Sequence, residues 1–265
     1  SVFIALVSPL LGAIADRGSA KKKLLIIFAF LGSLMTAALW LVQKGDWQLA
    51  VFFYIIATIG FMAGNIFYDS LLPSVAGREK VDYVSALGYS LGYLGGGLLF
   101  LANVLMYLHP DWFGIPDSST AIRISFVCVA MWWAIFTGPI IIFMPEPKIK
   151  KNVSLYDAIN GGFKQLKETF DNIRQMKIIG TFLMAFWMYE DGVATIVRMA
   201  AKIASSLGFA AGDIITAILM VQFIGFPAAL GYNWFAKKIG TKNAVLVAIL
   251  GYVVITFLGY LMTDI

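Results

Sequence analysis

Long apolar runs recur along the chain, and they restrict its fold more than any other feature of the sequence. A partial run covers residues 1–15, and fuller runs follow at 24–43, 48–72, 84–108, 121–144, 178–200, 211–235 and 243–262. Each full run has about 20 residues, enough for a helix rising about 1.5 Å per residue to cross a hydrocarbon core of about 30 Å. Only 13% of the residues are charged, far fewer than a soluble domain carries. The sequence therefore predicts an all-α, multi-pass membrane protein with about eight spans.

The Lys and Arg residues are concentrated in every second loop between these runs. Most of the 20 lie near residues 17–23, 78–80, 148–177 and 237–242. Because loops rich in Lys and Arg tend to stay in the cytoplasm, we expect these four loops on the cytoplasmic side. The same spread explains the net charge of +5 without a basic patch for nucleic acid. We expect the partners to be the lipid bilayer and a small-molecule solute, with no nucleic acid.

Residue types that hold metals or perform catalysis are scarce. The chain has a single cysteine, Cys128, and a single histidine, His109, which cannot together supply a zinc site. The sequence also contains no nucleotide-binding loop, no Ser-His-Asp set and no cofactor fingerprint. We therefore expect no metal, no cofactor and no enzymatic activity.

The longest loop separates the apolar runs into two groups. It begins with Pro145, which ends the preceding helix, and residues 155–176 carry apolar side chains at spacings of three and four. This predicts an amphipathic linker helix, a connector at the membrane surface, with a regulatory or partner-binding role as the alternative. We expect an N-terminal bundle at 1–144, the linker at 145–177 and a C-terminal bundle at 178–265. Since the chain opens inside one apolar run and ends just after another, we also expect it to be part of a longer protein.

Two loops that lie six predicted spans apart look related. Residues 12–23 and 233–242 each separate one span from the next, and this period is typical of a transporter with two parallel halves. The first loop resembles the signature loop of the major facilitator superfamily, Gly-x-x-x-Asp-Arg followed by Gly and basic residues. The matching residues are Gly12, Asp16, Arg17 and Lys21. The resemblance implies that this loop tethers neighbouring helices and gates the cytoplasmic side; the alternative is a solvated, charged loop.

Glycines recur in the run at 84–108. Gly88, Gly92 and Gly96 are spaced four apart, with Gly97 beside the last, and this spacing lets another helix backbone approach closely. The pattern is similar to the antiporter motif of exporting facilitators, although Tyr93 stands where that motif has proline. We expect these glycines to serve helix packing.

Two further stretches resemble one branch of the superfamily. They are Asn-Ile-Phe-Tyr-Asp-Ser-Leu-Leu-Pro at 65–73 and Glu-Asp-Gly-Val-Ala-Thr-Ile at 190–196. They are similar to the bacterial "unknown major facilitator" family, which is related to fungal autophagy-linked vacuolar effluxers of amino acids. The resemblance covers essentially the whole chain. It implies the twelve-helix major facilitator fold, two pseudo-repeat bundles of which this chain would hold roughly the second to the ninth helix. It also implies export of small solutes, with amino acids as the best match. We expect a proton-coupled monomer in a bacterial cell membrane.

Two adjacent carboxylates, Glu190 and Asp191, lie well inside the run at 178–200. Charged side chains within a bilayer are costly and usually functional. Neighbours on a helix point about 100° apart, so one carboxylate can face a central cavity while the other faces an adjacent helix. We hypothesise that one of them binds a coupling proton or a substrate ammonium group. The alternative is structural pairing with Arg198, Lys202 or Arg123.

Other polar residues within the runs are weaker candidates for the pathway. Asn65 and Asp69 lie one helical turn apart, and Asp69 can line a cavity or act as a gate residue that pairs with Arg17 or Arg78. Gln222 can line the pathway or bridge two helices. Arg123, at the outer start of its run, can bind a carboxylate or extend to the membrane interface.

These observations favour a secondary transporter that works by alternating access around a central site. A symporter of sugars or other organic solutes is the alternative within the same fold. A membrane protein that handles lipids or assists assembly, without transport, is the alternative outside it. A transporter would enclose its polar groups in one cavity, whereas a lipid-handling protein would show a polar stripe towards lipid.

Overall fold

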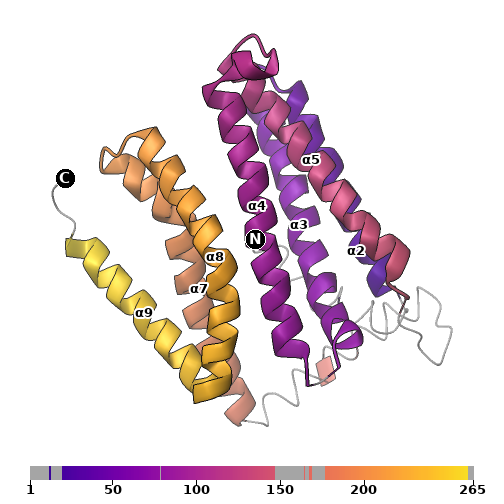
Figure 1. Ribbon diagram of the computed structural model, residues 1–265. Coiled ribbons are helices and arrows are strands. Elements are labelled where there is room, and N and C mark those ends of the chain that lie inside the picture. Colours follow the sequence, from indigo (N-terminus) through magenta and orange to yellow (C-terminus); the bar gives the residue numbers. More distant parts are fainter. Residues whose placement is uncertain are drawn as a thin grey trace. The chain divides into compact units, whose positions relative to one another are not determined.

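The computed structural model describes residue 12, residues 20–77 and 79–146, residues 164 and 167–168, and residues 177–261. The described elements are all helical, with no strand in these ranges (Figure 1). In chain order they are α2 (Lys21–Ala38), η1 (Leu39–Leu41), α3 (Trp47–Val75), α4 (Val81–Leu108), η2 (Pro110–Phe113), α5 (Ser118–Phe143), α7 (Lys177–Ser206), α8 (Ala211–Ile239) and α9 (Thr241–Leu261). The predicted all-α class is confirmed.

Within the described ranges, six helices are long and apolar enough to cross a membrane. They are the continuous stretch Lys21–Leu41, which joins α2 to η1, and α3, α4, α5, α8 and α9. They coincide with six of the seven full runs expected from the sequence, which confirms the membrane class. The partial run at 1–15 and most of the expected linker helix at 155–176 lie outside the described residues.

The remaining full run, at 178–200, forms α7, a helix of 30 residues that is not among those six. Glu190 and Asp191 lie near its middle, and Arg198 and Lys202 follow within its second half. These charges dilute its apolar character, and α7 is also the most amphipathic of the described helices. We attribute the difference from the other runs to these four side chains.

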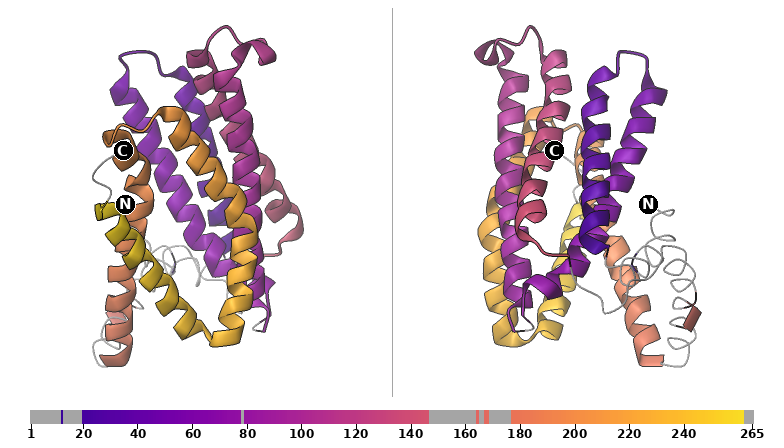
Figure 2. Two further views of the ribbon diagram at one scale, coloured as in Figure 1. Left: turned by 60° about the vertical axis from the view of Figure 1, so that its left-hand side comes forward. Right: turned by 90° about the vertical axis from the view of Figure 1, so that its right-hand side faces the viewer.

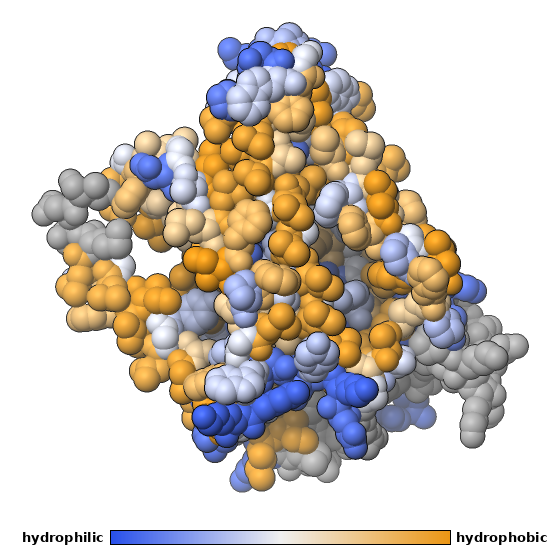
Figure 3. All heavy atoms as spheres, viewed as in Figure 1, coloured by the Kyte–Doolittle hydropathy of each residue, from blue (hydrophilic) through white to orange (hydrophobic). Residues whose placement is uncertain are grey.

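The surface of the helices is apolar, as expected for a protein surrounded by lipid. Many large apolar side chains are exposed, among them Phe143 at 79% and Ile178 at 86%. In Figure 3 apolar side chains cover the long sides of the helices, whereas hydrophilic side chains gather towards the helix ends. Exposed apolar area of this extent marks a surface that meets lipid or other helices rather than water.

The chain divides into two compact units. Unit 1 contains α2, η1, α3, the second part of α4 from Leu99, η2 and α5. Unit 2 contains the first part of α4, Asp82–Leu98, together with α7, α8 and α9. The bundle boundaries expected from the sequence stay a prediction.

In unit 1, α2 packs against both α3 and α5 (Figure 2). The backbones of α2 and α3 come close at two glycines, because a Cβ atom added at Gly60 would lie 2.7 Å from the backbone nitrogen of Gly32. The indole ring of Trp133 covers Gly32 from α5. Nearby, the Ser33 hydroxyl donates a 2.7 Å hydrogen bond to the carbonyl oxygen of Ala130. Small residues thus allow three helix backbones to come close together.

The start of α2 and the end of α5 cap one another. The backbone amides of Lys22 and Lys23 donate to the two carboxylate oxygens of Glu146, at 3.0 and 3.2 Å. In return, the Lys22 ammonium group donates to the carbonyl oxygens of Ile141 and Met144, at 2.8 and 2.5 Å. The negative charge lies at a helix N-terminus and the positive charge at a helix C-terminus, where each complements the helix dipole.

In unit 2, a single residue joins α8 to α9. Gly240 separates the two helices and adopts a φ of +86°, a conformation that side chains with a Cβ atom rarely adopt. Its amide donates to the carbonyl of Ala236, and its own carbonyl accepts from the amide of Ala244. The two helices diverge from this turn (Figure 1).

Candidate functional site

The first part of α4 lies against α8 in unit 2, and three contacts define how they meet. The Ser90 hydroxyl, which is fully buried, donates a 2.7 Å hydrogen bond to the carbonyl oxygen of Phe226. A Cβ atom at Gly225 would lie 2.7 Å from the Tyr93 ring. A Cβ atom at Gly96 would lie 3.1 Å from the side-chain nitrogen of Gln222. Residue numbers rise along α4 as they fall along α8, so the two helices run antiparallel.

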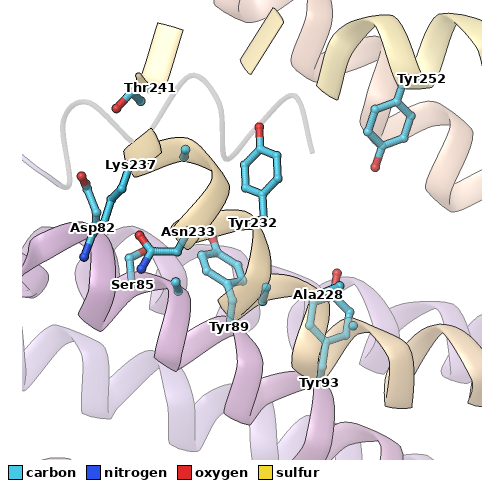
Figure 4. A pocket seen from close by; sticks show the side chains of 14 residues that line it. Asp82, Ser85, Tyr89, Tyr93, Ala228, Tyr232, Asn233, Lys237, Thr241 and Tyr252 are labelled. Atoms are coloured by element: carbon cyan, nitrogen blue, oxygen red, sulfur yellow. The ribbon is translucent and has the colours of Figure 1, made fainter. Parts of the chain in front are cut away.

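A cavity of about 650 Å³ lies beside this contact, lined by residues of α4, α8 and α9 that all belong to unit 2. Polar side chains gather at one end of the cavity, as Figure 4 shows: Asp82, Ser85, Asn233, Lys237 and Thr241. Tyrosine side chains continue from there along the cavity: Tyr89 and Tyr93 from α4, Tyr232 from α8 and Tyr252 from α9. The volume lies within the range of small-molecule sites, about 300–1,000 Å³.

Asp82 and Lys237 give the polar end of the cavity one charge of each sign. Asp82 lies in the first turn of α4 and Lys237 in the last turn of α8, where each complements its helix dipole. The Lys237 ammonium nitrogen lies 5.8 Å from the centre of the Tyr83 ring. Among the described residues, neither charge has an oppositely charged group within 4.0 Å. Both charges therefore remain available to a ligand.

Comparison with known proteins places the chain in a family. A family model described as "Vacuole effluxer Atg22 like" matches residues 1–264. The chain belongs to this Atg22-like family. A relative from Bacillus subtilis (strain 168), named "Uncharacterized MFS-type transporter YxiO", is 34% identical over 99% of the chain and 61% of its own length. "Autophagy-related protein 22" of Yarrowia lipolytica is 23% identical over 69% of the chain and 43% of its own length.

The Atg22-like chain thus spans about three fifths or less of the length of these relatives. No solved structure matches it. Family membership agrees with the resemblance seen in the stretches at 65–73 and 190–196. It also confirms the expected connection to autophagy-linked effluxers.

In this family member, Glu190 and Asp191 are both exposed on α7. The proposed structural partners on the same helix, Arg198 and Lys202, are exposed too, and none of the four forms an ion pair with another described residue. The structure thus places the carboxylates near the middle of a long helix without assigning them a partner. Their role as proton or substrate ligands stays a prediction.

The residues expected at the gate are only partly described. Gly12 is helical and Lys21 begins α2, whereas Asp16 and Arg17 lie outside the described residues. Arg78, the other expected partner of Asp69, lies outside them as well.

Asn65 and Asp69 are exposed on α3 in unit 1, whereas Gln222 is half-buried on α8 in unit 2. Gln222 lies against Gly96 and Gly97, which fits the helix-bridging interpretation. A Cβ atom at Gly92 would meet nothing within 4 Å, and Gly88 is half-buried. The packing role expected for the four glycines together, Gly88, Gly92, Gly96 and Gly97, stays a prediction.

Arg123 has a structural partner that the sequence did not suggest. Its guanidinium group donates to the carbonyl oxygen of Trp40 from Nε at 2.9 Å and from Nη2 at 2.6 Å. It also lies over the Trp40 indole ring, 4.6 Å from its centre. The side chain therefore caps the end of η1 inside unit 1.

The tyrosine-lined cavity was missed by sequence reasoning. One available signal was the four-residue spacing of Ser85, Tyr89 and Tyr93, which places them along one face of α4. A second was the placement of Asp82 one turn before that series. The contribution of α8 and α9 was not readable, because it depends on which helices come together.

Proposed function

We propose that the full-length protein is a secondary active transporter of small organic solutes, with amino-acid efflux as its activity. The observation that carries the proposal is the family match over residues 1–264. Two structural features support it: six helices of membrane-spanning length and a cavity lined by polar and aromatic side chains in unit 2. A cavity bounded by such helices provides a binding place for a polar solute that the bilayer core would otherwise exclude.

The transport cycle is alternating access, in which two helical bundles rock about a central site. In this proposal Glu190 or Asp191 takes up the coupling proton or binds a substrate ammonium group. The two carboxylates are adjacent on α7, so they point about 100° apart, and one can face a central cavity while the other faces an adjacent helix.

The orientation we propose follows the distribution of the basic residues. Lys21, Lys22 and Lys23 at the start of α2 and Lys237 and Lys238 at the end of α8 lie on the cytoplasmic side of a bacterial cell membrane. The loop with Asp16 and Arg17 then acts as the cytoplasmic gate. The polar end of the unit 2 cavity, which includes Lys237, opens to the same side.

The test is transport in proteoliposomes that contain the full-length protein, with a panel of labelled amino acids, with and without a pH gradient. We expect gradient-dependent movement of at least one amino acid. The Glu190→Gln/Asp191→Asn double variant should abolish this movement while its thermal unfolding stays that of the wild type. Asp213→Asn, which removes an exposed carboxylate from the first turn of α8, is the matched control and should transport normally.

Full activity of the double variant would remove these carboxylates from the mechanism. Movement of sugars or other organic solutes without any amino acid would replace the substrate class while keeping the transporter. Failure to move any solute would count against transport itself.

A further inference from the structure

The cavity in unit 2 has two chemically different ends. At one end, Asp82 and Lys237 supply opposite charges from two different helices, with the Asn233 amide beside them. At the other end, Tyr93 and Tyr252 supply aromatic surface (Figure 4). A ligand that matches both ends needs a positive group, a negative group and an apolar part.

The two charges do not neutralise one another. Asp82 and Lys237 are both exposed, and within the described part of the chain neither forms an ion pair. The helix dipoles explain why each charge is tolerated at its helix end, because Asp82 lies at an N-terminus and Lys237 at a C-terminus. They do not explain why two opposite charges line the same cavity, which is the arrangement that a ligand with both charges requires.

The aromatic wall is held in place by the packing of α4 on α8. The Tyr93 ring lies directly against Gly225, and the buried Ser90–Phe226 hydrogen bond fixes the helices close to it. An apolar group of a ligand can stack on a ring that is already positioned, so little side-chain freedom is lost on binding.

We propose that this cavity is a binding site for a small zwitterion that carries an aromatic or large aliphatic group. Lys237 binds the carboxylate of the ligand, Asp82 binds its ammonium group, and the tyrosines contact its apolar group. The proposal rests on the proposed transport function, since it assigns the carried solute a docking site at the cytoplasmic mouth. It is a separate assignment from Glu190 and Asp191, because neither of these residues lines the cavity.

The experiment measures equilibrium binding of labelled L-phenylalanine to the full-length protein in phosphatidylglycerol proteoliposomes. Phenethylamine, which lacks the carboxylate, and 3-phenylpropionate, which lacks the ammonium group, serve as competitors. We expect each to compete at least about tenfold more weakly than phenylalanine, because each loses one charge partner worth about 1.4 kcal/mol.

Two charge variants assign the partners. Lys237→Gln should weaken phenylalanine and 3-phenylpropionate about tenfold and leave phenethylamine unchanged. Asp82→Asn should weaken phenylalanine and phenethylamine and leave 3-phenylpropionate unchanged. A general loss of folding would affect all three ligands equally, so the crossed pattern distinguishes ligand contact from misfolding.

Two matched controls are available on α8. Lys238→Gln removes the neighbouring ammonium group, which lies over the Trp234 ring at 5.4 Å and does not line the cavity. Asp213→Asn removes a carboxylate from the opposite end of α8. Neither should change the binding of any of the three ligands.

Several results would overturn the site. These are equal binding of phenethylamine and phenylalanine to the wild type, an identical loss of all three ligands in both charge variants, or no loss in either. Displacement of phenylalanine when phosphatidylethanolamine replaces part of the lipid would assign the cavity to a lipid headgroup instead.

The binding site and the transport function can fail separately. If the wild type transports amino acids while the site fails these tests, the transport function is kept and the site is rejected. If the crossed binding pattern holds but no solute moves, the site stands and the transport function fails.

Discussion

The two units differ in what their tightly packed glycines contact: a helix backbone in unit 1 and an aromatic side chain in unit 2. In unit 1, Gly60 faces the backbone of Gly32, whereas in unit 2 Gly225 faces the ring of Tyr93; a Cβ atom would come within 2.7 Å in both places. The Gly32 backbone cannot move without shifting its whole helix, whereas the Tyr93 side chain can rotate when a methyl group is added. The comparison predicts that an added methyl group separates the helices in unit 1, whereas in unit 2 it displaces one aromatic side chain that the glycine otherwise keeps in position.

The burial of side chains supports the same contrast. In unit 1, Phe67 is fully buried, and it stacks on Phe28 with ring centres 5.8 Å apart. In unit 2, α7 and α8 contain no buried residue at all among those described. Stability should therefore depend mainly on unit 1, and ligand binding on unit 2.

The largest effect is expected from Gly60→Ala. The new methyl group would press on the Gly32 backbone and the Phe28 carbonyl oxygen, and helices cannot yield there without separating. We expect the free energy of unfolding to fall by about 3 kcal/mol, measured by chemical denaturation in detergent micelles. Gly92→Ala, with no atom within 4 Å of the new methyl group, is the control and should be neutral or stabilising by up to about 1 kcal/mol. Similar losses in both variants would contradict the contrast.

Lys22→Met should produce the next largest effect. It removes two hydrogen bonds from an ammonium group to the last carbonyl oxygens of the α5 region, while it keeps the aliphatic stem. We expect a loss of about 1.5 kcal/mol, because the group is only partly buried and its hydrogen bonds are weakened by solvent. Lys23→Met is the control, since only the backbone amide of Lys23 contributes to the mutual cap. Equal unfolding curves for the two variants would show that the side-chain half of the cap contributes nothing.

Gly225→Ala should cost less stability than either but should change binding. The new methyl group displaces the Tyr93 ring, which can rotate, so we expect the free energy of unfolding to fall by only about 1 kcal/mol. Phenylalanine affinity should fall about fivefold, because the displaced ring no longer lies along the cavity. Gly60→Ala, measured under conditions where it remains folded, should bind phenylalanine normally. A loss of phenylalanine binding in both variants would contradict the inference that ligand binding depends on unit 2 and not on unit 1.

The smallest effect is expected from Asp117→Asn at the start of α5. The Thr120 backbone amide and hydroxyl donate to the Asp117 carboxylate at 2.8 and 2.9 Å, and they lower its pKa below the ordinary value of 3.8. A lowered pKa in the folded state adds stability above pH 3.8 and loses it as the pH falls through the lowered value. Asparagine keeps a capping oxygen without the charge. Thermal unfolding should therefore show a slight deficit for the variant at pH 7 that shrinks towards pH 3; a deficit independent of pH would contradict this account.

The sequence predicted the spans well, because a bilayer requires long continuous apolar helices whatever their neighbours are. It was less informative about α7, where Glu190 and Asp191 interrupt an otherwise apolar run. The glycine contact of unit 1 was not anticipated, because the four-residue spacing of Gly60 and Gly64 on α3 does not reveal that Gly32 of α2 faces Gly60. Such contacts depend on which helices pack together, and local patterns in a single sequence do not show this.

The candidate site shows the same limit. Sequence reasoning selects polar residues within apolar runs, which led to Glu190 and Asp191. Asp82 and Lys237 lie at helix ends, where charges are ordinary, so their charges alone did not mark them before α4 and α8 were placed side by side. Arg123 illustrates the converse, because a conspicuous charge in a run turned out to have a structural partner in Trp40.

Because a single residue, Gly240, joins α8 to α9, any motion of α9 relative to α8 is a rotation of a rigid helix about that residue. With no slack in the connection, α9 cannot slide along α8, and its relative motion is confined to swinging about that turn. Tyr252 lies 12 residues beyond Gly240, about 18 Å along the helix, so a swing of about 10° would carry its ring through about 3 Å. A small torsional change at Gly240 would therefore change the width of the cavity several helical turns away.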